Sequence, residues 1–228
     1  MISLSNAVVF GWHSAIMGMR NPMNSWSKSD SVFYSDFSCQ IGQNDLDLME
    51  RLIKSGAEHR KFLRMIHVQM DIEAPLYWWK EFETYKIGIV SNSCSTMHKI
   101  HEKEFTIDDF SHEHLINTGC DLFNVEWDNG LFNRNIQPMD FLNGYIIHSL
   151  NVVRKKFLET KDKDYWWQMI QLLPSSYNQL RTVDLDYEVL LNQYFQRKDH
   201  KLDEWRIYCE QIKCFPYLND FIEVLKNE

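Results

Sequence analysis

The stretch HVQMDIEAPLYWWKEF, residues His67 to Phe82, decides the fold. Apolar and polar residues alternate over residues 66–72, and this period of two predicts a half-buried strand that ends at Ala74-Pro75. Proline is tolerated in the first turn of a helix, so we expect a helix directly after the strand. That helix carries its large apolar residues on one face.

Helical periodicity recurs along the rest of the chain. Residues 44–56 place Leu46, Met49 and Ile53 at helical spacing, and Gly56 is a typical helix stop. We expect further helices at about 138–160, 164–173, 187–196 and 202–212, and after Pro216. The remaining expectations are a strand at 7–12, a short helix capped by Ser14 that ends at Arg20, and a loop at 25–38.

These patterns predict a single α+β domain over residues 1–228, mostly helical with a small mixed sheet. Residues 106–137 contain several turn sequences, among them Asp128-Asn129-Gly130, and we expect a surface excursion there. A chain of 228 residues that is 44% hydrophobic and 25% charged can bury a core of this kind.

Charge and cysteine content restrict the class of protein. A formal charge of -8 argues against binding to duplex nucleic acid, which needs a cationic face, whereas a free nucleotide needs only a local cationic pocket. The five cysteines include no C-x-x-C pair and indicate neither a disulfide framework nor a zinc ribbon. The start of the chain lacks signal-peptide features, and no stretch approaches the ~20 apolar residues of a membrane span. We therefore expect a cytoplasmic protein without a membrane partner.

Two segments combine aromatic bulk with hydroxyl, amide and cationic groups. The first runs from Ala74 to Lys99 and the second from Leu173 to Arg197. A flat ring that carries a phosphate needs this combination, and we expect the two segments to form one anion-holding cleft. Two alternatives stay open. Ser95 can simply cap a helix start, and Arg197 can be a solvated cation at the end of its helix.

The order of these elements resembles the flavin-dependent thymidylate synthases, the ThyX family, over most of the chain. The similar stretches are residues 15–20 followed by Ser25, the helix that ends at Gly56, the strand that ends at Ala74-Pro75, and residues 173–197. Within the last stretch, Leu190, Asn192 and Arg197 match the residue types of the family.

The family signature is altered in this chain. The family has Arg-His-Arg and, further on, Ser-x-Arg. Thr84-Tyr85-Lys86 stands at the first place, and the hydroxyl and cationic groups of residues 93–99 stand at the second. Lysine lacks the bidentate fork of arginine, so Lys86 makes a weaker or differently aimed contact than the family's arginine.

The resemblance implies an FAD-dependent enzyme that methylates C5 of a dUMP-like pyrimidine nucleotide, with NADPH and methylenetetrahydrofolate as co-substrates and with an altered substrate left open. It also implies a homotetramer. The implied nucleotide-binding residues are Ser93, Ser95, His98, Lys99 and Arg197. The implied cofactor-binding residues are Lys86, Gln179, Asn192 and Arg197, and the candidates for a catalytic role are Lys86 and Arg181.

Other features have simpler interpretations. The pairs Trp78-Trp79 and Trp166-Trp167 are more typical of packing than of ring stacking on a ligand. The histidines between residues 98 and 114 match no established ligand pattern, so we predict no metal site. The alternative function is a non-catalytic nucleotide- or partner-binding protein on the same scaffold, because the opening Arg-His pair of the signature is missing.

Overall fold

The computed structural model describes residues 1–36, 38–117, 123–127 and 132–226. The described chain divides into two compact units. The helical unit consists of Met1, Ala74–Trp79 and Ser93–Gln179, and the sheet unit consists of Ile2–Glu73, Lys80–Asn92 and Leu180–Glu228.

The described chain contains both strands and helices of varied length. In chain order the strands are β1 (Ser3–Phe10), β2 (Val32–Phe33), β3 (Cys39–Gln40), β4 (His67–Pro75), β5 (Ile89–Ser93), β6 (Phe123–Trp127), β7 (Phe132–Ile136) and β8 (Asn178–Asp186). The α-helices are α1 (Trp12–Arg20), α2 (Gln43–Lys54), α3 (Leu76–Phe82), α4 (Pro138–Phe141), α5 (His148–Thr160), α6 (Lys163–Leu172), α7 (Tyr187–Arg197), α8 (Asp203–Ile212) and α9 (Leu218–Lys226).

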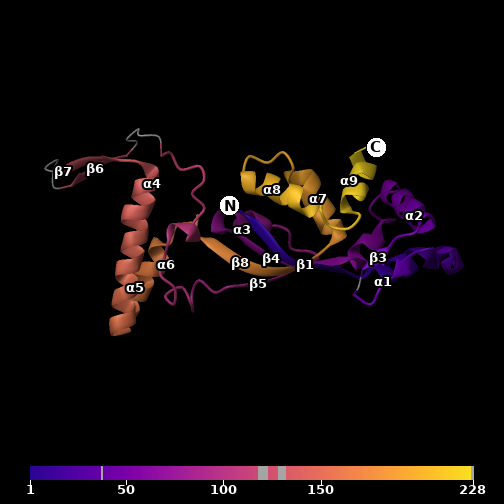
Figure 1. Ribbon diagram of the computed structural model, residues 1–228, viewed down its shortest axis with the longest axis horizontal. Helices are drawn as coiled ribbons and strands as arrows, with labels where there is room; N and C mark the ends of the chain where they lie inside the picture. The colour runs from indigo at the N-terminus through magenta and orange to yellow at the C-terminus, as the bar shows by residue number, and fades with distance from the viewer. Residues whose placement is uncertain (37, 118–122, 128–131, 227–228) are drawn as a thin grey trace. The chain divides into compact units, whose positions relative to one another are not determined.

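A four-stranded sheet in the order β1-β4-β8-β5 organises the sheet unit (Figure 1). The alternation predicted for β4 is confirmed, because Val68, Met70 and Ile72 are at most 1% exposed while the residues between them reach the surface. β1 pairs antiparallel with β4, with Leu4 opposite Ile72. Because successive side chains of a strand point to opposite faces, one face of β4 is apolar and buried.

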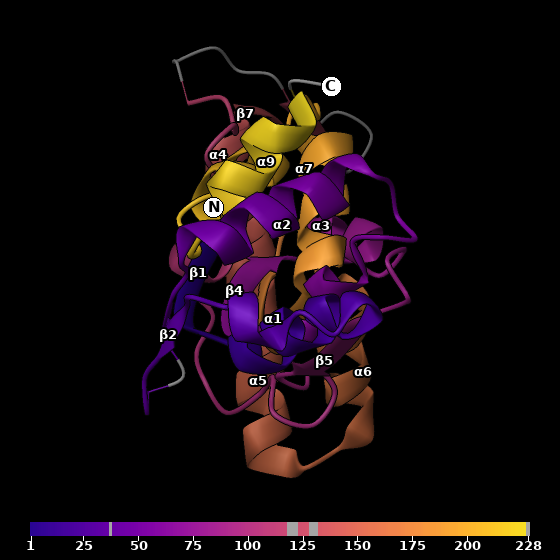
Figure 2. The same ribbon diagram turned by 90° about the vertical axis from the view of Figure 1, so that its right-hand side faces the viewer.

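The helices of the sheet unit follow the predicted pattern. α2, α7, α8 and α9 lie where periodicity placed helices, and α9 packs beside α2 (Figure 2). Ser14 is not the cap of α1, because the helix already begins at Trp12. Gly11 precedes it with φ of 96°, a conformation that favours glycine, and a side chain there would collide with the carbonyl of Met65.

The helical unit contains a separate core. α5 and α6 lie side by side (Figure 1), and the predicted helix over 138–160 exists, although a turn of π-helix at Leu142–Ile147 separates α4 from α5. His148, the first residue of α5, is exposed. The core consists of Ile100, Phe105, Phe110, Leu142, Ile147, Leu150 and Met169.

The α+β class is confirmed, with a small antiparallel sheet in place of the mixed sheet expected. Within the predicted excursion, β6 and β7 form a two-stranded hairpin, and its predicted turn at 128–130 lies outside the described residues. The patterns missed β8, because Gln179 occupies a buried position of the strand and Leu180 an exposed one. The single-domain prediction stays a prediction.

A buried ion pair connects α1 to α2. The Nε atom of Arg20 donates to Asp45 Oδ1 at 2.6 Å, and the two side chains are 3% and 0% exposed. Burial raises the pKa of the Asp45 carboxyl, but hydrogen bonds from Ser31, Ser29 and Arg20 outweigh it and hold the pKa below its usual value. The carboxylate is therefore ionised in the folded protein at neutral pH.

Asp45→Asn should lower the free energy of unfolding by about 3–5 kcal/mol, because it leaves the Arg20 charge buried without a counter-charge. Urea denaturation at neutral pH measures the loss. The depressed pKa contributes stability that is present above the usual carboxyl pKa and is lost below it, so the difference from wild type should shrink toward about pH 3. Asp47→Asn, on the exposed face of the same helix, is the matched control; a loss of the same size in both variants would contradict the account.

Candidate functional site

The carboxylate of Glu81 is the centre of a polar cluster in the sheet unit. Its Oε2 atom accepts hydrogen bonds from Arg197 Nη1 at 2.9 Å and from Trp205 Nε1 at 3.1 Å. His200 Nε2 lies 3.3 Å from the same oxygen, and His200 Nδ1 accepts from the backbone N–H of Leu202, which leaves the ring proton on Nε2. One carboxylate thus faces three donors from the end of α7, the following turn and α8.

The guanidinium of Arg197 is held between two aromatic rings. Its central carbon lies 4.8 Å from the centre of the Trp205 ring and 5.6 Å from that of Tyr85. Its Nε donates to the Tyr85 hydroxyl at 3.0 Å, and that hydroxyl donates to Gln196 at 2.9 Å. The cation–π contacts and the hydrogen bonds of the planar guanidinium hold the side chain in one orientation.

Asp186 caps the start of α7. Asp186 accepts from the backbone N–H of Val189 at 2.8 Å. Burial raises the pKa of the Asp186 carboxyl, although the bond from Val189 lowers it in part. Gly88 has φ of 75°, and a side chain there would meet this carboxylate at 2.5 Å. Glycine at 88 therefore lets the chain after Lys86 pass close to α7.

A tight turn in the helical unit carries the predicted phosphate-binding residues. The Ser95 hydroxyl accepts from the backbone N–H groups of Met97 at 3.2 Å and His98 at 3.0 Å. Trp166 Nε1 donates to the Met97 carbonyl at 2.9 Å, which ties the turn to α6. The cap interaction expected for Ser95 exists, but it closes a turn and no helix follows.

Gln179, a predicted cofactor contact, is buried in the helical unit. Its side-chain Nε2 donates to the Cys94 carbonyl at 2.7 Å, and its backbone carbonyl accepts from Trp79 Nε1 at 3.0 Å. The side chain therefore positions the segment that leads into the Ser95 turn.

The remaining candidates differ in exposure. Asn192 and Lys86 are exposed, with no hydrogen bond to another described residue, and Arg181 Nη1 pairs with Glu83 at 2.7 Å. Ser93, Ser95, His98, Lys99 and Gln179 belong to the helical unit, and Lys86, Arg181, Asn192 and Arg197 to the sheet unit. A common cleft of the two groups stays a prediction.

The paired tryptophans pack as predicted in α3. Trp78 and Trp79 are 0% and 1% exposed, with ring centres 5.0 Å apart. In α6, Trp166 packs on the core while Trp167 is 41% exposed. Across the described ranges, no cluster of three or more His, Cys, Asp or Glu side chains is arranged to hold a metal ion.

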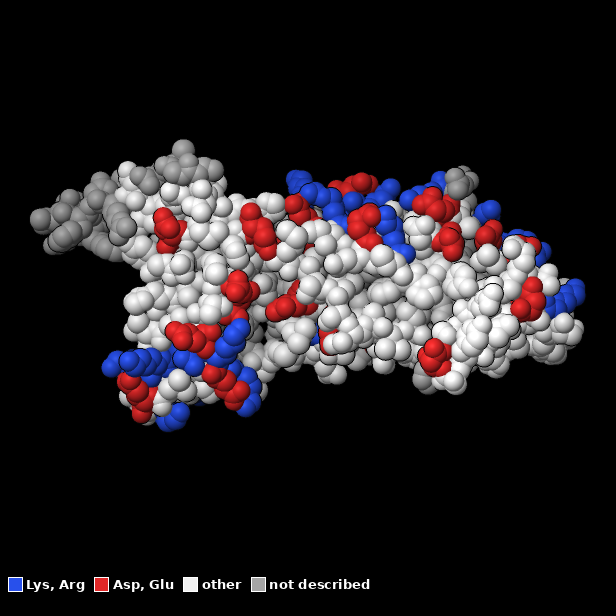
Figure 3. Space-filling view, in the orientation of Figure 1, with Lys and Arg blue, Asp and Glu red and all other residues white. Residues whose placement is uncertain are grey.

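Acidic and basic side chains are intermixed on the face drawn in Figure 3, without an extended cationic surface there. Among the described residues, no helix has the length and apolar character that a membrane crossing requires.

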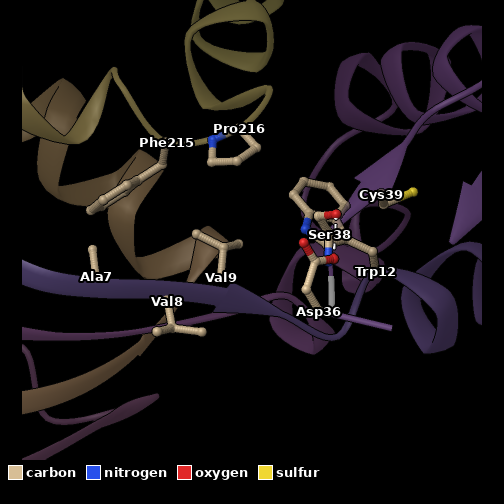
Figure 4. Close-up of a pocket in the computed structure, with 9 residues that line it drawn as sticks. All are labelled: Ala7, Val8, Val9, Trp12, Asp36, Ser38, Cys39, Phe215 and Pro216. Carbon is tan, nitrogen blue, oxygen red and sulfur yellow. Dashed lines mark hydrogen bonds between the residues drawn. The ribbon is translucent and has the colours of Figure 1, made fainter. Parts of the chain in front are cut away.

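A separate pocket of about 340 Å³ lies in the sheet unit (Figure 4). Its walls are mostly apolar, with Val9 and Phe215 on one side and Trp12 near the polar end. At that end the Ser38 side chain and backbone donate to Asp36 and lower the pKa of its carboxyl. None of the predicted site residues lines this pocket.

The structure is similar to solved enzymes over nearly the whole chain. Flavin-dependent thymidylate synthase ThyX from Helicobacter pylori, complexed with FAD and dUMP, gives a TM-score of 0.62 at 17% identity over 97% of this chain and 96% of that chain. A second crystal structure of the H. pylori enzyme with FAD and dUMP gives 0.62 at 18% identity over 99% and 98%. The UMP/dUMP methylase PolB from Streptomyces cacaoi, bound with 5-Br dUMP, gives 0.56 at 12% identity over 93% and 88%.

This chain has the ThyX fold. No family model matches its sequence, and no curated protein does. Sequence reasoning missed Glu81, His200 and Trp205 as members of the site cluster. The only signal was an acidic residue just before Thr84-Tyr85-Lys86, and the donors that it meets lie more than 100 residues later.

Ser95→Ala should speed hydrogen exchange of the Met97 and His98 amides roughly fivefold, because a side-chain cap of this kind contributes about 1 kcal/mol. Exchange followed by mass spectrometry or NMR measures the change. Ser91→Ala, in exposed β5, is the control and should leave both amides unchanged. Equal protection in wild type and Ser95→Ala would show that the hydroxyl does not hold the turn.

Proposed function

We propose that the protein binds FAD and a dUMP-like pyrimidine nucleotide and catalyses a thymidylate synthase-like methylation at C5. The observation that supports this most is the similarity over 93–99% of the chain to enzymes whose crystal structures contain FAD, dUMP or a bromo-dUMP. Similarity at this level of identity gives the fold, so the activity itself is our proposal.

The residues present fit a phosphate group at the Ser95 turn. Ser93, His98 and Lys99 are exposed around it, and the hydroxyl, imidazole and ammonium groups are chemically suited to phosphate oxygens. Lys99 pairs with Glu102, and both side chains are more than half exposed. Solvent screens such an exposed pair and it stabilises the fold little, so a phosphate can replace Glu102 at little cost.

The residues also fit the polar edge of a flavin. The amide of Asn192 offers both a donor and an acceptor on the exposed side of α7, and the ammonium of Lys86 offers a positive charge. In this proposal bound FAD supplies the hydride, with NADPH as reductant and methylenetetrahydrofolate as one-carbon donor. The protein's part is to hold and orient the nucleotide and the cofactor.

A second candidate is a nucleotide-binding protein without turnover. It is favoured by Tyr85, which stands where the family signature has histidine. Its hydroxyl bonds to Gln196 and Arg197 within the sheet unit, so this group serves the packing of the protein itself. Arg197, in turn, is paired with Glu81. These contacts leave fewer free groups for chemistry on a nucleotide.

The purified full chain should take up FAD, show a flavin absorbance spectrum, and change that spectrum when dUMP is added. Lys99→Ala should weaken dUMP binding about tenfold, because it removes a charge-assisted hydrogen bond to phosphate. Lys155→Ala, an exposed lysine of α5, is the control and should bind as wild type does. Methylated product from dUMP, NADPH and methylenetetrahydrofolate would support the enzyme over the binding protein. A chain that takes up neither FAD nor dUMP would refute both.

A further inference from the structure

Most nitrogen atoms of the Arg197 guanidinium already have hydrogen-bond partners within the protein. Nη1 is bonded to Glu81 and Nε to Tyr85, and the Trp205 and Tyr85 rings lie against it. Nη2 has no hydrogen-bond partner among the described residues, and it is not one of the buried unpaired atoms, so it reaches solvent. A ligand therefore meets one nitrogen of a guanidinium whose charge is already balanced.

Glu81 holds its position more firmly than the other carboxylate beside a candidate cation. The Glu102 side chain that pairs with Lys99 is 56% exposed, and Lys99 is 69% exposed. Glu81 and Arg197 are 35% and 19% exposed, and the indole of Trp205 adds a second hydrogen bond to the same carboxylate oxygen. Exposed pairs exchange partners easily, whereas a partly buried carboxylate that loses its donors pays a desolvation penalty.

Binding of an anionic ligand at Arg197, in addition to the Glu81 carboxylate, is therefore disfavoured for two reasons. The ligand gains little attraction from a guanidinium already paired with a carboxylate, and it is repelled by the nearby Glu81 charge. The indole N–H cannot help, because its single donor is directed at Glu81. Neither reason applies to a neutral acceptor, such as a carbonyl oxygen, which can still bond to Nη2.

We infer that Glu81 is a specificity-determining residue that excludes phosphate from Arg197. The phosphate of a nucleotide then binds at the Ser95 turn, and Arg197 serves an uncharged acceptor. The claim that the ligand is a nucleotide rests on the proposed function. The exclusion of an anion by Glu81 does not depend on it.

Inorganic phosphate titrated into the full chain without flavin or nucleotide tests the inference. Glu81→Gln removes the charge but keeps the shape and an acceptor oxygen for Trp205. Isothermal titration calorimetry should show phosphate affinity about tenfold or more above wild type, since a hydrogen bond to a charged group is gained. Glu81→Gln combined with Arg197→Met should return the affinity to the wild-type level, because the gain depends on Arg197.

Glu83→Gln is the matched control. Glu83 lies two residues away and pairs with Arg181, so the net charge changes equally while Arg197 keeps its partner. Phosphate affinity should stay within about twofold of wild type. Near-ultraviolet circular dichroism checks folding, and Glu81→Ala is the second neutral variant if Glu81→Gln does not fold.

Unchanged phosphate affinity in a folded neutral Glu81 variant would overturn the inference, as would an equal gain in Glu83→Gln or a gain that survives Arg197→Met. These outcomes leave the proposed function intact, because no FAD or dUMP is used. Conversely, a chain that binds no FAD can still show the gain.

Discussion

Glu81, bonded to Arg197 and to Trp205, joins the ends of three helices in the sheet unit. Glu81 lies in the last turn of α3, where the helix dipole disfavours a negative charge. Arg197 lies in the last turn of α7, where the dipole favours its positive charge, and Trp205 is in α8. The hydrogen bonds to the Glu81 carboxylate offset its unfavourable placement, and the rings of Trp205 and Tyr85 lie against the Arg197 guanidinium.

The contact between Glu81 and Arg197 makes the two candidate cations of the site differ in how much positive charge they offer to a ligand. The partly buried Arg197 of the sheet unit is paired with the partly buried Glu81, whereas the exposed Lys99 of the Ser95 turn is paired with the exposed Glu102. In our proposal, an anionic ligand therefore binds at the turn, where positive charge is exposed. The turn is itself ordered by the Ser95 hydroxyl and by Trp166, so its backbone does not have to be organised by the ligand.

Local patterns predicted much of the fold. β4 was predictable because every second residue is apolar, and α2 and α7 because their apolar residues recur at helical spacing. β8 was not, because Gln179 is buried to position the Ser95 turn, and this depends on a contact with Cys94 that is distant in sequence. The π-helical turn at Leu142–Ile147 also has no clear local signal.

For the site, the sequence supplied residue types but not their partners. Arg197 and Lys99 were predicted from chemistry and from the resemblance to ThyX, yet a carboxylate that removes one cation from use is visible only once the helices pack. Glu81 and Trp205 are 124 residues apart, and no periodicity connects them. From residue type alone, Arg197 and Lys99 are equivalent candidates. Their hydrogen bonds in the structure distinguish them.

A crystal structure of the protein with FAD and dUMP tests the central claim most directly. The account predicts phosphate oxygens within hydrogen-bond distance of the Ser95 turn, with the bond between Glu81 and Arg197 intact. A phosphate bound to Arg197, with Glu81 displaced from it, would contradict the account.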